Sequence, residues 1–331
     1  GDHKDLLLSN RRLLDADVLP LVAVLPRIED LAQVDLSENG ITDEAVVPLM
    51  KKLQEHHALT LRSLSFAKNP VTSRSVAALV EVASKSLRYL SKLDLTGVPI
   101  GKVYPSLGSC IGAHPSLTDV SIGDTGLGNE PHIAKQVVDS VISNTRLQRL
   151  DLSWNILTHD VFMILGKGTA DHGQLTTLNL ACTSAKLDMP YPSMETFLEC
   201  LAGNQSVTHL DLSSNRLGPK ECLMLEEACG SSKRVERLVM AGNQVGGAGL
   251  RALLRLMSQE NNAFARLDLE GTENFGDEGE VGPPRLEHRF SPCDPTGPYV
   301  LDLSLPFPRS FLRLLTALEG RIAGRDDGGF S

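Results

Sequence analysis

The nine residues LQRLDLSWN, at positions 147–155, decide the fold of this chain. Apolar side chains occupy the first, fourth and sixth places of the stretch, and an asparagine occupies the ninth. The same spacing starts at Leu31, Leu61, Leu90, Leu117, Leu147, Leu175, Val207, Val235 and Phe264. Successive starts lie 27 to 32 residues apart, and such a recurrence indicates a repeat architecture.

Each repeat is expected to form one strand followed by one helix. The fourth and sixth places are apolar and their neighbours are polar, which is the alternation of a β-strand. Downstream, apolar residues recur at helical spacing, as in Ala45, Leu49 and Leu53. The asparagine at the ninth place, such as Asn155, is expected to satisfy backbone groups of neighbouring coils through its amide.

A strand and a helix of this length cannot bury their own apolar faces, so the repeats must stack around one continuous core. The predicted fold is an α/β solenoid of horseshoe shape. Its parallel sheet lies on the concave side and its helices on the convex side, because helices are wider than strands. We expect an irregular N-terminal cap at residues 1–30, about nine repeats at 31–275, and a C-terminal region at 276–331.

The C-terminal region is predicted to close the core of the array. Residues Glu273–Pro298 are rich in Gly, Pro and acidic side chains, which is typical of a loop. Tyr299–Leu303 is interpreted as a degenerate final strand, and Pro308–Ile322 as a capping helix.

The strand ends Asp151-Leu152-Ser153-Trp154-Asn155 and Asp211-Leu212-Ser213-Ser214-Asn215 resemble those of the ribonuclease-inhibitor-like subclass of leucine-rich-repeat proteins. Within this subclass the chain resembles the C-terminal region of the mitochondrial member of the NOD-like receptor family. The resemblance lies in the leucine-rich N-terminal cap, the short array and the helical C-terminal cap. It implies an innate-immune regulator at mitochondria, with RNA and antiviral signalling adaptors as partners.

The sequence carries no pattern that indicates an enzyme, a cofactor or a metal site. It has no phosphate-binding loop, and its six cysteines lack zinc spacing and are expected to be reduced in an intracellular protein. His56 and His57 have no third ligand and are interpreted as a solvated helix end. No run of eighteen apolar residues occurs, so no membrane insertion is expected.

Candidate binding residues lie on the predicted concave face, where the third and fifth places of each strand point out of the core. The third place holds Lys92, Arg149, Arg237 and Arg266, and the fifth holds Asp94, Asp151 and Asp211. The Asp column is also typical of the subclass, and its members could simply neutralise the arginines. Trp154 follows its strand, where it is either an interface hot spot or packs against a neighbouring loop.

A concave sheet without reactive groups favours a binding or regulatory module. The net charge of −9 favours a protein partner, whereas the resemblance implies a signalling adaptor and adds RNA. The location is expected to be intracellular: cytoplasmic or, by resemblance, mitochondrial. Two alternatives stay open: a structural scaffold that forms homo-oligomers, and a GTPase-activating leucine-rich-repeat protein.

Overall fold

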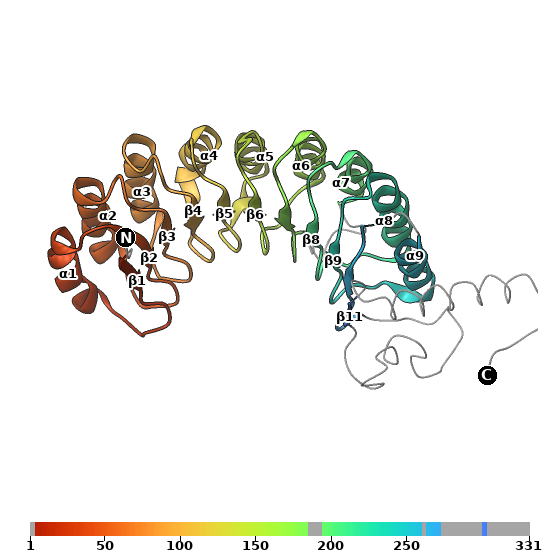
Figure 1. Cartoon of the computed structure of the whole chain (residues 1–331), viewed down its shortest axis with the longest axis horizontal. Helices are drawn as coiled ribbons and strands as arrows, with labels where there is room; N and C mark the ends of the chain where they lie inside the picture. Colours follow the sequence, from red (N-terminus) through yellow and green to blue (C-terminus); the bar gives the residue numbers. More distant parts are fainter. Residues whose placement is uncertain (1–3, 185–193, 260–262, 273–299, 303–331) are drawn as a thin grey trace, which may run out of the picture.

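The structure is a computed structural model that describes residues 4–184, 194–259, 263–272 and 300–302. The chain forms an arc with strands on the inner side and helices on the outer side (Figure 1). The strands are β1 (Lys4–Leu7), β2 (Leu31–Asp35), β3 (Ser63–Ser65), β4 (Lys92–Asp94), β5 (Asp119–Ser121), β6 (Arg149–Asp151), β7 (Thr177–Asn179), β8 (His209–Asp211), β9 (Arg237–Val239), β10 (Arg266–Asp268) and β11 (Val300–Asp302). The helices are α1 (Asp15–Val24), α2 (Asp43–His56), α3 (Ser73–Lys85), α4 (Tyr104–Ala113), α5 (Pro131–Ile142), α6 (His159–Asp171), α7 (Glu195–Cys200), α8 (Pro219–Ser232) and α9 (Gly246–Ser258).

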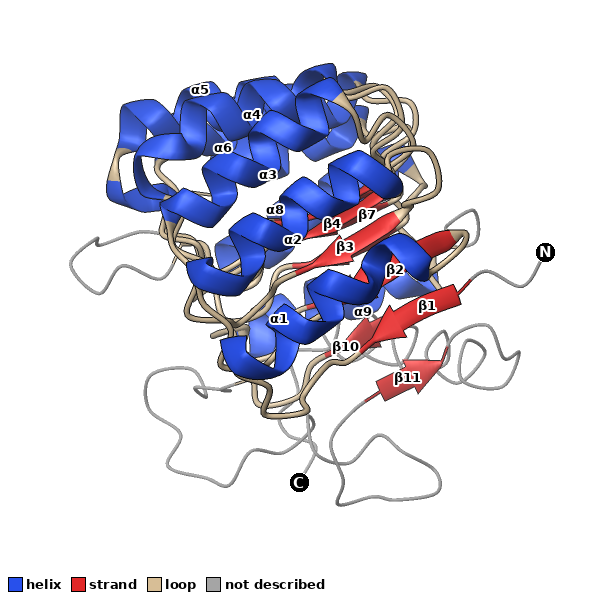
Figure 2. Ribbon diagram, turned by 90° about the vertical axis from the view of Figure 1, so that its left-hand side faces the viewer, coloured by secondary structure: helices blue, strands red, loops and turns tan. Residues whose placement is uncertain are grey.

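Strands β1 to β10 form one parallel sheet in which each strand pairs with the next along the chain. The end-on view shows the helices stacked in a layer against one face of this sheet (Figure 2). The register aligns the fourth-place residues of all repeats side by side: Leu6, Val34, Leu64, Leu93, Val120, Leu150, Leu178, Leu210, Leu238 and Leu267. The predicted α/β solenoid and the phase of its repeats are therefore confirmed.

One aliphatic core runs the length of the arc between the sheet and the helices. In the central repeat, Leu150 and Leu152 are buried from the strand side, and Val161 and Leu165 from α6. Each repeat shares this core with both neighbours, so the stability of one coil depends on the coils beside it.

Buried asparagines connect neighbouring coils, as the sequence predicts. The amide of Asn215 donates to the carbonyl oxygens of Leu180 (2.7 Å) and Leu212 (3.0 Å), and its Oδ1 accepts from the backbone N–H of Thr183 (2.8 Å). Where threonine replaces asparagine, the Thr183 hydroxyl donates to Leu180 O at 2.7 Å. These bonds satisfy backbone groups that would otherwise be buried without partners.

The N-terminal segment differs from the irregular cap expected at residues 1–30. Strand β1 pairs in parallel with β2, α1 follows it, and Asn39 Oδ1 accepts from the backbone N–H groups of Arg11 and Leu13 (3.0 Å each). The segment thus has the strand–helix plan of a repeat. The pattern missed it because His3 and Arg11 stand at the places of the first leucine and the asparagine.

At the C-terminal end, the strand predicted at Tyr299–Leu303 is present as β11, which pairs antiparallel with β10. Its direction differs from that of the repeat strands, so it borders the parallel array without extending its repeat. The predicted loop at Glu273–Pro298 and the predicted capping helix at Pro308–Ile322 lie outside the described residues.

The interpretation of His57 as part of a solvated helix end is wrong, although His56 is solvent-accessible. His57 is buried, and its Nε2 lies 3.0 Å from the carbonyl oxygen of Leu25 in the preceding coil. His114 makes the same contact with Leu87 O (3.1 Å), and its Nδ1 accepts from backbone N–H groups. These histidines therefore connect coils at the ends of the helices, as the asparagines do beside the strands.

We expect the solenoid to lose thermal stability as the pH falls from 7.5 to 5.5. Burial lowers the pKa of His57 and of His114 below the usual 6.5. The unfolded chain takes up protons near pH 6.5 while the folded histidines stay neutral, so protonation favours unfolding at lower pH. At a pH above the pKa of histidine in the unfolded chain, the two histidines are neutral in both the folded and the unfolded chain, and the loss of stability is absent.

Melting temperatures across this range test the expectation, with the double variant His57→Gln, His114→Gln as comparison. The melting temperature of the variant should change less with pH than that of the unmodified chain. Equal slopes for the two proteins would show that these rings do not carry the effect.

Candidate binding surface

The third-place side chains form a row across the concave face, and their partners differ along it. Arg149 on β6 lies beside Asp119 on β5 and forms an ion pair with it. Lys92, on the other side of Asp119, is exposed and opposite this carboxylate in the strand register. The basic side chains at this end of the row are thus interrupted by an acidic one.

Arg237 and Arg266, in contrast, lie side by side in the register of β9 and β10. Both are half-buried, and neither forms an ion pair within the described part of the chain. Their Nε atoms are buried without a hydrogen-bond partner. Strands β7 and β8 separate this pair from Arg149, so the predicted basic residues do not form one continuous column.

The predicted acidic column at the fifth place has a local structural role. Asp94, Asp151 and Asp211 are half-buried, and Oδ1 of each accepts a hydrogen bond from the backbone N–H two residues later, at 3.0, 2.9 and 2.9 Å. Each carboxylate therefore fixes the turn that follows its own strand. The ion pair of Arg149 is made with Asp119, and not with a member of the fifth-place column.

Trp154 occupies a special backbone position on the rim of the arc. The eighth place is left-handed in consecutive coils, with φ of +51° at Asp124, +58° at Trp154 and +55° at Cys182. Such a conformation costs a bulky residue about 1–2 kcal/mol relative to glycine. The Trp154 side chain is nevertheless 64% exposed, and that of Ile156 is 41% exposed. Trp154 therefore does not bury its ring against a neighbouring loop, which was one of the two expectations.

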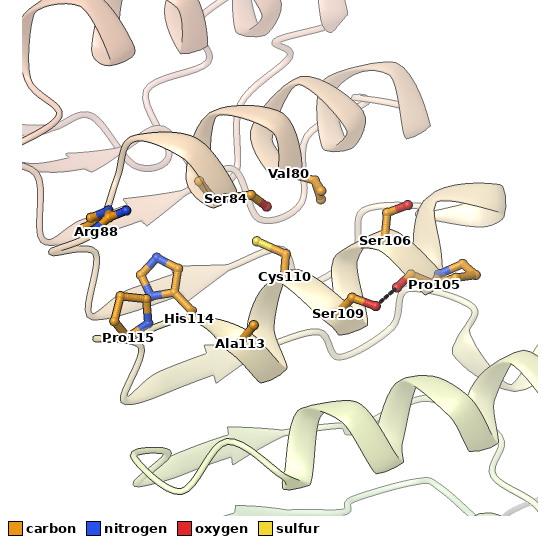
Figure 3. Close-up of a pocket in the computed structure, with 11 residues that line it drawn as sticks. Val80, Ser84, Arg88, Pro105, Ser106, Ser109, Cys110, Ala113, His114 and Pro115 are labelled. Atoms are coloured by element: carbon orange, nitrogen blue, oxygen red, sulfur yellow. Dashed lines mark hydrogen bonds between the residues drawn. The ribbon is translucent and has the colours of Figure 1, made fainter.

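A separate cleft of about 730 Å³ lies on the convex side between α3 and α4 (Figure 3). Its lining includes Val80, Ser84, Cys110 and His114. Both ring nitrogens of His114 are engaged by backbone groups, and burial raises the pKa of the Cys110 thiol. The cleft thus lacks a base that could activate its thiol.

Reactive constellations are not found in the part of the chain that the structure describes. No group of three His, Cys, Asp or Glu residues there could hold a metal ion. The five described cysteines are free, and burial raises the pKa of Cys222 and of Cys229 to about 12. These two thiols are protonated at neutral pH and are therefore poor nucleophiles. None of the described helices has the length and apolar character needed to span a membrane.

A family model described as "Leucine Rich repeat" matches residues 31–50, 203–220 and 233–254. The chain is built of leucine-rich repeats. This assignment agrees with the strand register and with the buried asparagines that bond neighbouring coils. The matched segments include β2, β8 and β9 and so lie towards both ends of the arc.

Several curated proteins are similar to this leucine-rich-repeat chain. Tonsoku-like protein of Danio rerio is 26% identical over 275 residues, which are 80% of this chain and 19% of that protein. Tonsoku-like protein of Bos taurus is 28% identical over 266 residues, 78% of this chain and 19% of that protein. NACHT, LRR and PYD domains-containing protein 5 of Homo sapiens is 27% identical over 215 residues, 64% of this chain and 17% of that protein. The chain thus spans about a fifth of the length of these relatives.

Among solved structures, the match to a protein of Bacteroides fragilis covers 82% of this chain and 75% of that protein, with 13% identity and a TM-score of 0.46. The match to an internalin of Listeria monocytogenes covers 83% of this chain and 82% of the internalin, with 15% identity and a TM-score of 0.33.

Sequence reasoning did not single out three residues that distinguish this surface. Val239 stands where most described strands have an acidic or polar fifth-place residue, and the repeat spacing alone already places it in that column. His209 stands at the third place of its repeat by spacing alone, and the register sets it beside Arg237. Ile156 is exposed beside Trp154, although its apolar character alone favours burial.

Proposed function

We propose that this leucine-rich-repeat chain is a protein-binding module of a longer protein and holds its partner on the concave sheet and the adjoining rim. The observation that carries the proposal is the exposure of Trp154, with Ile156 also exposed two residues later, on the turn that follows β6. Tryptophan is enriched among the residues that dominate binding energy at interfaces. A side chain that is this exposed buries little apolar surface on folding, which favours a role in binding.

The chain's own charge supports a protein partner over RNA. The net charge is −9, and the third-place row is interrupted by Asp119. A nucleic-acid backbone needs a continuous basic track, because affinity comes from releasing counterions at many phosphates. Under this proposal, Lys92, Arg149, Arg237 and Arg266 contribute polar contacts, and Trp154 supplies the apolar anchor.

Trp154→Ala is expected to weaken binding of the partner by at least about fivefold without lowering the melting temperature. The partner is first captured from cell extract with the unmodified chain, with and without ribonuclease, and then purified for titration. Leu223→Ala is the matched control, because Leu223 is also exposed but lies on α8 at the convex side.

Two results would contradict the proposal. Equal affinities of the unmodified chain and Trp154→Ala would remove the rim from the interface. Loss of capture after ribonuclease treatment would favour RNA as the direct ligand.

A second candidate function is the ligand-recognition region of an innate-immune NOD-like receptor that regulates antiviral signalling, including at mitochondria. The similarity to NACHT, LRR and PYD domains-containing protein 5 favours it. The Tonsoku-like similarity covers more of the chain and favours an interaction scaffold instead. Capture of a signalling adaptor, retained after ribonuclease treatment, would support the receptor function. Self-association of the purified chain at micromolar concentration, without another partner, would support a homo-oligomeric scaffold.

A further inference from the structure

Resting on the proposed function, we infer that the β8–β10 end of the concave face binds an acidic segment of the protein partner, through Arg237 and Arg266. These two side chains project from directly paired positions on neighbouring parallel strands. Neighbouring strands lie about 4.8 Å apart, so two guanidinium-bearing side chains leave the sheet close together. Like charges directly opposite each other on a sheet are unfavourable for folding.

On their outer sides, the register pairs Arg266 with Asp302 of β11 and Arg237 with His209 of β8. Within the described residues neither arginine has an ion-pair partner, and the buried Nε–H group of each has no acceptor. Asp211 accepts from the backbone N–H and the hydroxyl of Ser213, and Asp268 accepts from the backbone N–H of Glu270. Oδ1 of each carboxylate thus fixes the turn that follows its own strand, and neither carboxylate forms an ion pair with the two arginines. Arg149, by comparison, has Asp119 beside it and needs no external partner.

The fork of an arginine side chain matches a carboxylate, which can accept two parallel hydrogen bonds. Ligand carboxylates bound to the terminal Nη groups of Arg237 and Arg266 would remove the repulsion between them. His209 is exposed on the next strand and extends the same row. An extended segment that crosses β8, β9 and β10 could therefore present acidic side chains to consecutive members of the row.

Val239 favours a protein segment over a nucleic acid. It lies two residues after Arg237 on the same face of β9 and is half-buried. It is flanked in the register by Asp211 and Asp268. These carboxylates repel a continuous polyanion, whereas an acidic peptide can place an apolar side chain over Val239 and its carboxylates over the arginines.

The test uses the chain as it exists and a labelled peptide of alternating glutamate and valine, with a peptide of alternating glutamine and valine as control. The arginine Nε–H signals are followed by NMR, and Arg237→Gln and Arg266→Gln assign them. We expect the glutamate peptide alone to shift both signals saturably. The double variant Arg237→Gln, Arg266→Gln should lower the affinity at least about tenfold. Arg74→Gln, on the convex helix α3, should bind as the unmodified chain does.

The melting temperature of the double variant is measured alongside. It should equal or exceed that of the unmodified chain, because the change removes a repulsion and two buried donors without acceptors. Arg237→Lys, Arg266→Lys keeps the charges without the forks, and its affinity should fall between those of the other two proteins.

Four outcomes would overturn the inference: no saturable shift with the glutamate peptide, unchanged affinity in the double glutamine variant, equal shifts with inorganic phosphate, or preferential shifts with a twelve-nucleotide oligouridylate. Failure of the proposed function is a separate result. If the captured partner still binds the concave rim through Trp154 while the arginine variant binds it normally, the protein-binding function stands and only the arginine site is wrong.

Discussion

Leu152→Asp is expected to unfold the central coils of the solenoid. Leu152 has no exposed surface and lies in the core that its repeat shares with both neighbours. Burying an unpaired carboxylate costs several kcal/mol, which is comparable to the entire stability of a typical domain, about 5–15 kcal/mol. Far-UV circular dichroism and thermal melting should show loss of helix signal and of the cooperative transition.

Trp154→Asp is the matched control for that variant, because it introduces the same side chain two residues away at an exposed site. Asp124 already occupies the corresponding left-handed place one coil earlier, so the melting temperature should be unchanged or slightly higher. Unchanged melting of Leu152→Asp would mean that the repeat phase is wrong. A collapse of Trp154→Asp would mean that the rim is part of the core.

Asn215→Leu should lower the free energy of unfolding by about 3 kcal/mol or more, because each buried group left without a partner costs about 1–3 kcal/mol. The substitution leaves the backbone N–H groups of Thr183 and Ser184 without their acceptor and the carbonyl oxygen of Leu212 without its side-chain donor, whereas Leu180 O keeps the Thr183 hydroxyl. The urea midpoint measures the loss.

A graded series of variants separates the loss of these hydrogen bonds from a general intolerance of position 215 to substitution. Asn215→Thr should lose less than Asn215→Leu, since Thr183 already bonds to Leu180 O through its hydroxyl. Asn129→Leu, at an exposed asparagine, should leave the midpoint nearly unchanged. Equal losses for Asn215→Leu and Asn215→Thr would contradict the hydrogen-bond account.

The sequence predicts the fold well where one residue type has one physical task. The leucines at the fourth and sixth places must be buried, and the asparagine must bond the backbone, so their spacing alone defines the sheet. Strand β1 was not recognised because His3 and Arg11 replace two of these markers. The coil-to-coil bond of His57, whose acceptor lies 32 residues away, was missed because His57 stands outside the strand pattern that gives the asparagines their role.

The candidate surface is less predictable, because its properties depend on which side chains meet between repeats. The sequence places Arg149, Arg237 and Arg266 on one face, yet only the register pairs the first with Asp119 and sets the other two against each other. The carboxylates of Asp151 and Asp211 were candidates for binding, but each is bonded to the turn beyond its own strand. That distinction depends on distances of a few ångströms between atoms, which the spacing of residues in the sequence cannot supply.

Hydroxyl-radical footprinting of the chain, alone and with its purified captured partner, tests most directly whether the concave side and its rim bind protein. We predict that the partner protects Trp154, Ile156 and the side chains of β8–β10, while exposed residues of the convex helices, such as Leu223, react as before. Protection confined to the convex helices, with Trp154 still fully reactive in the complex, would contradict the account.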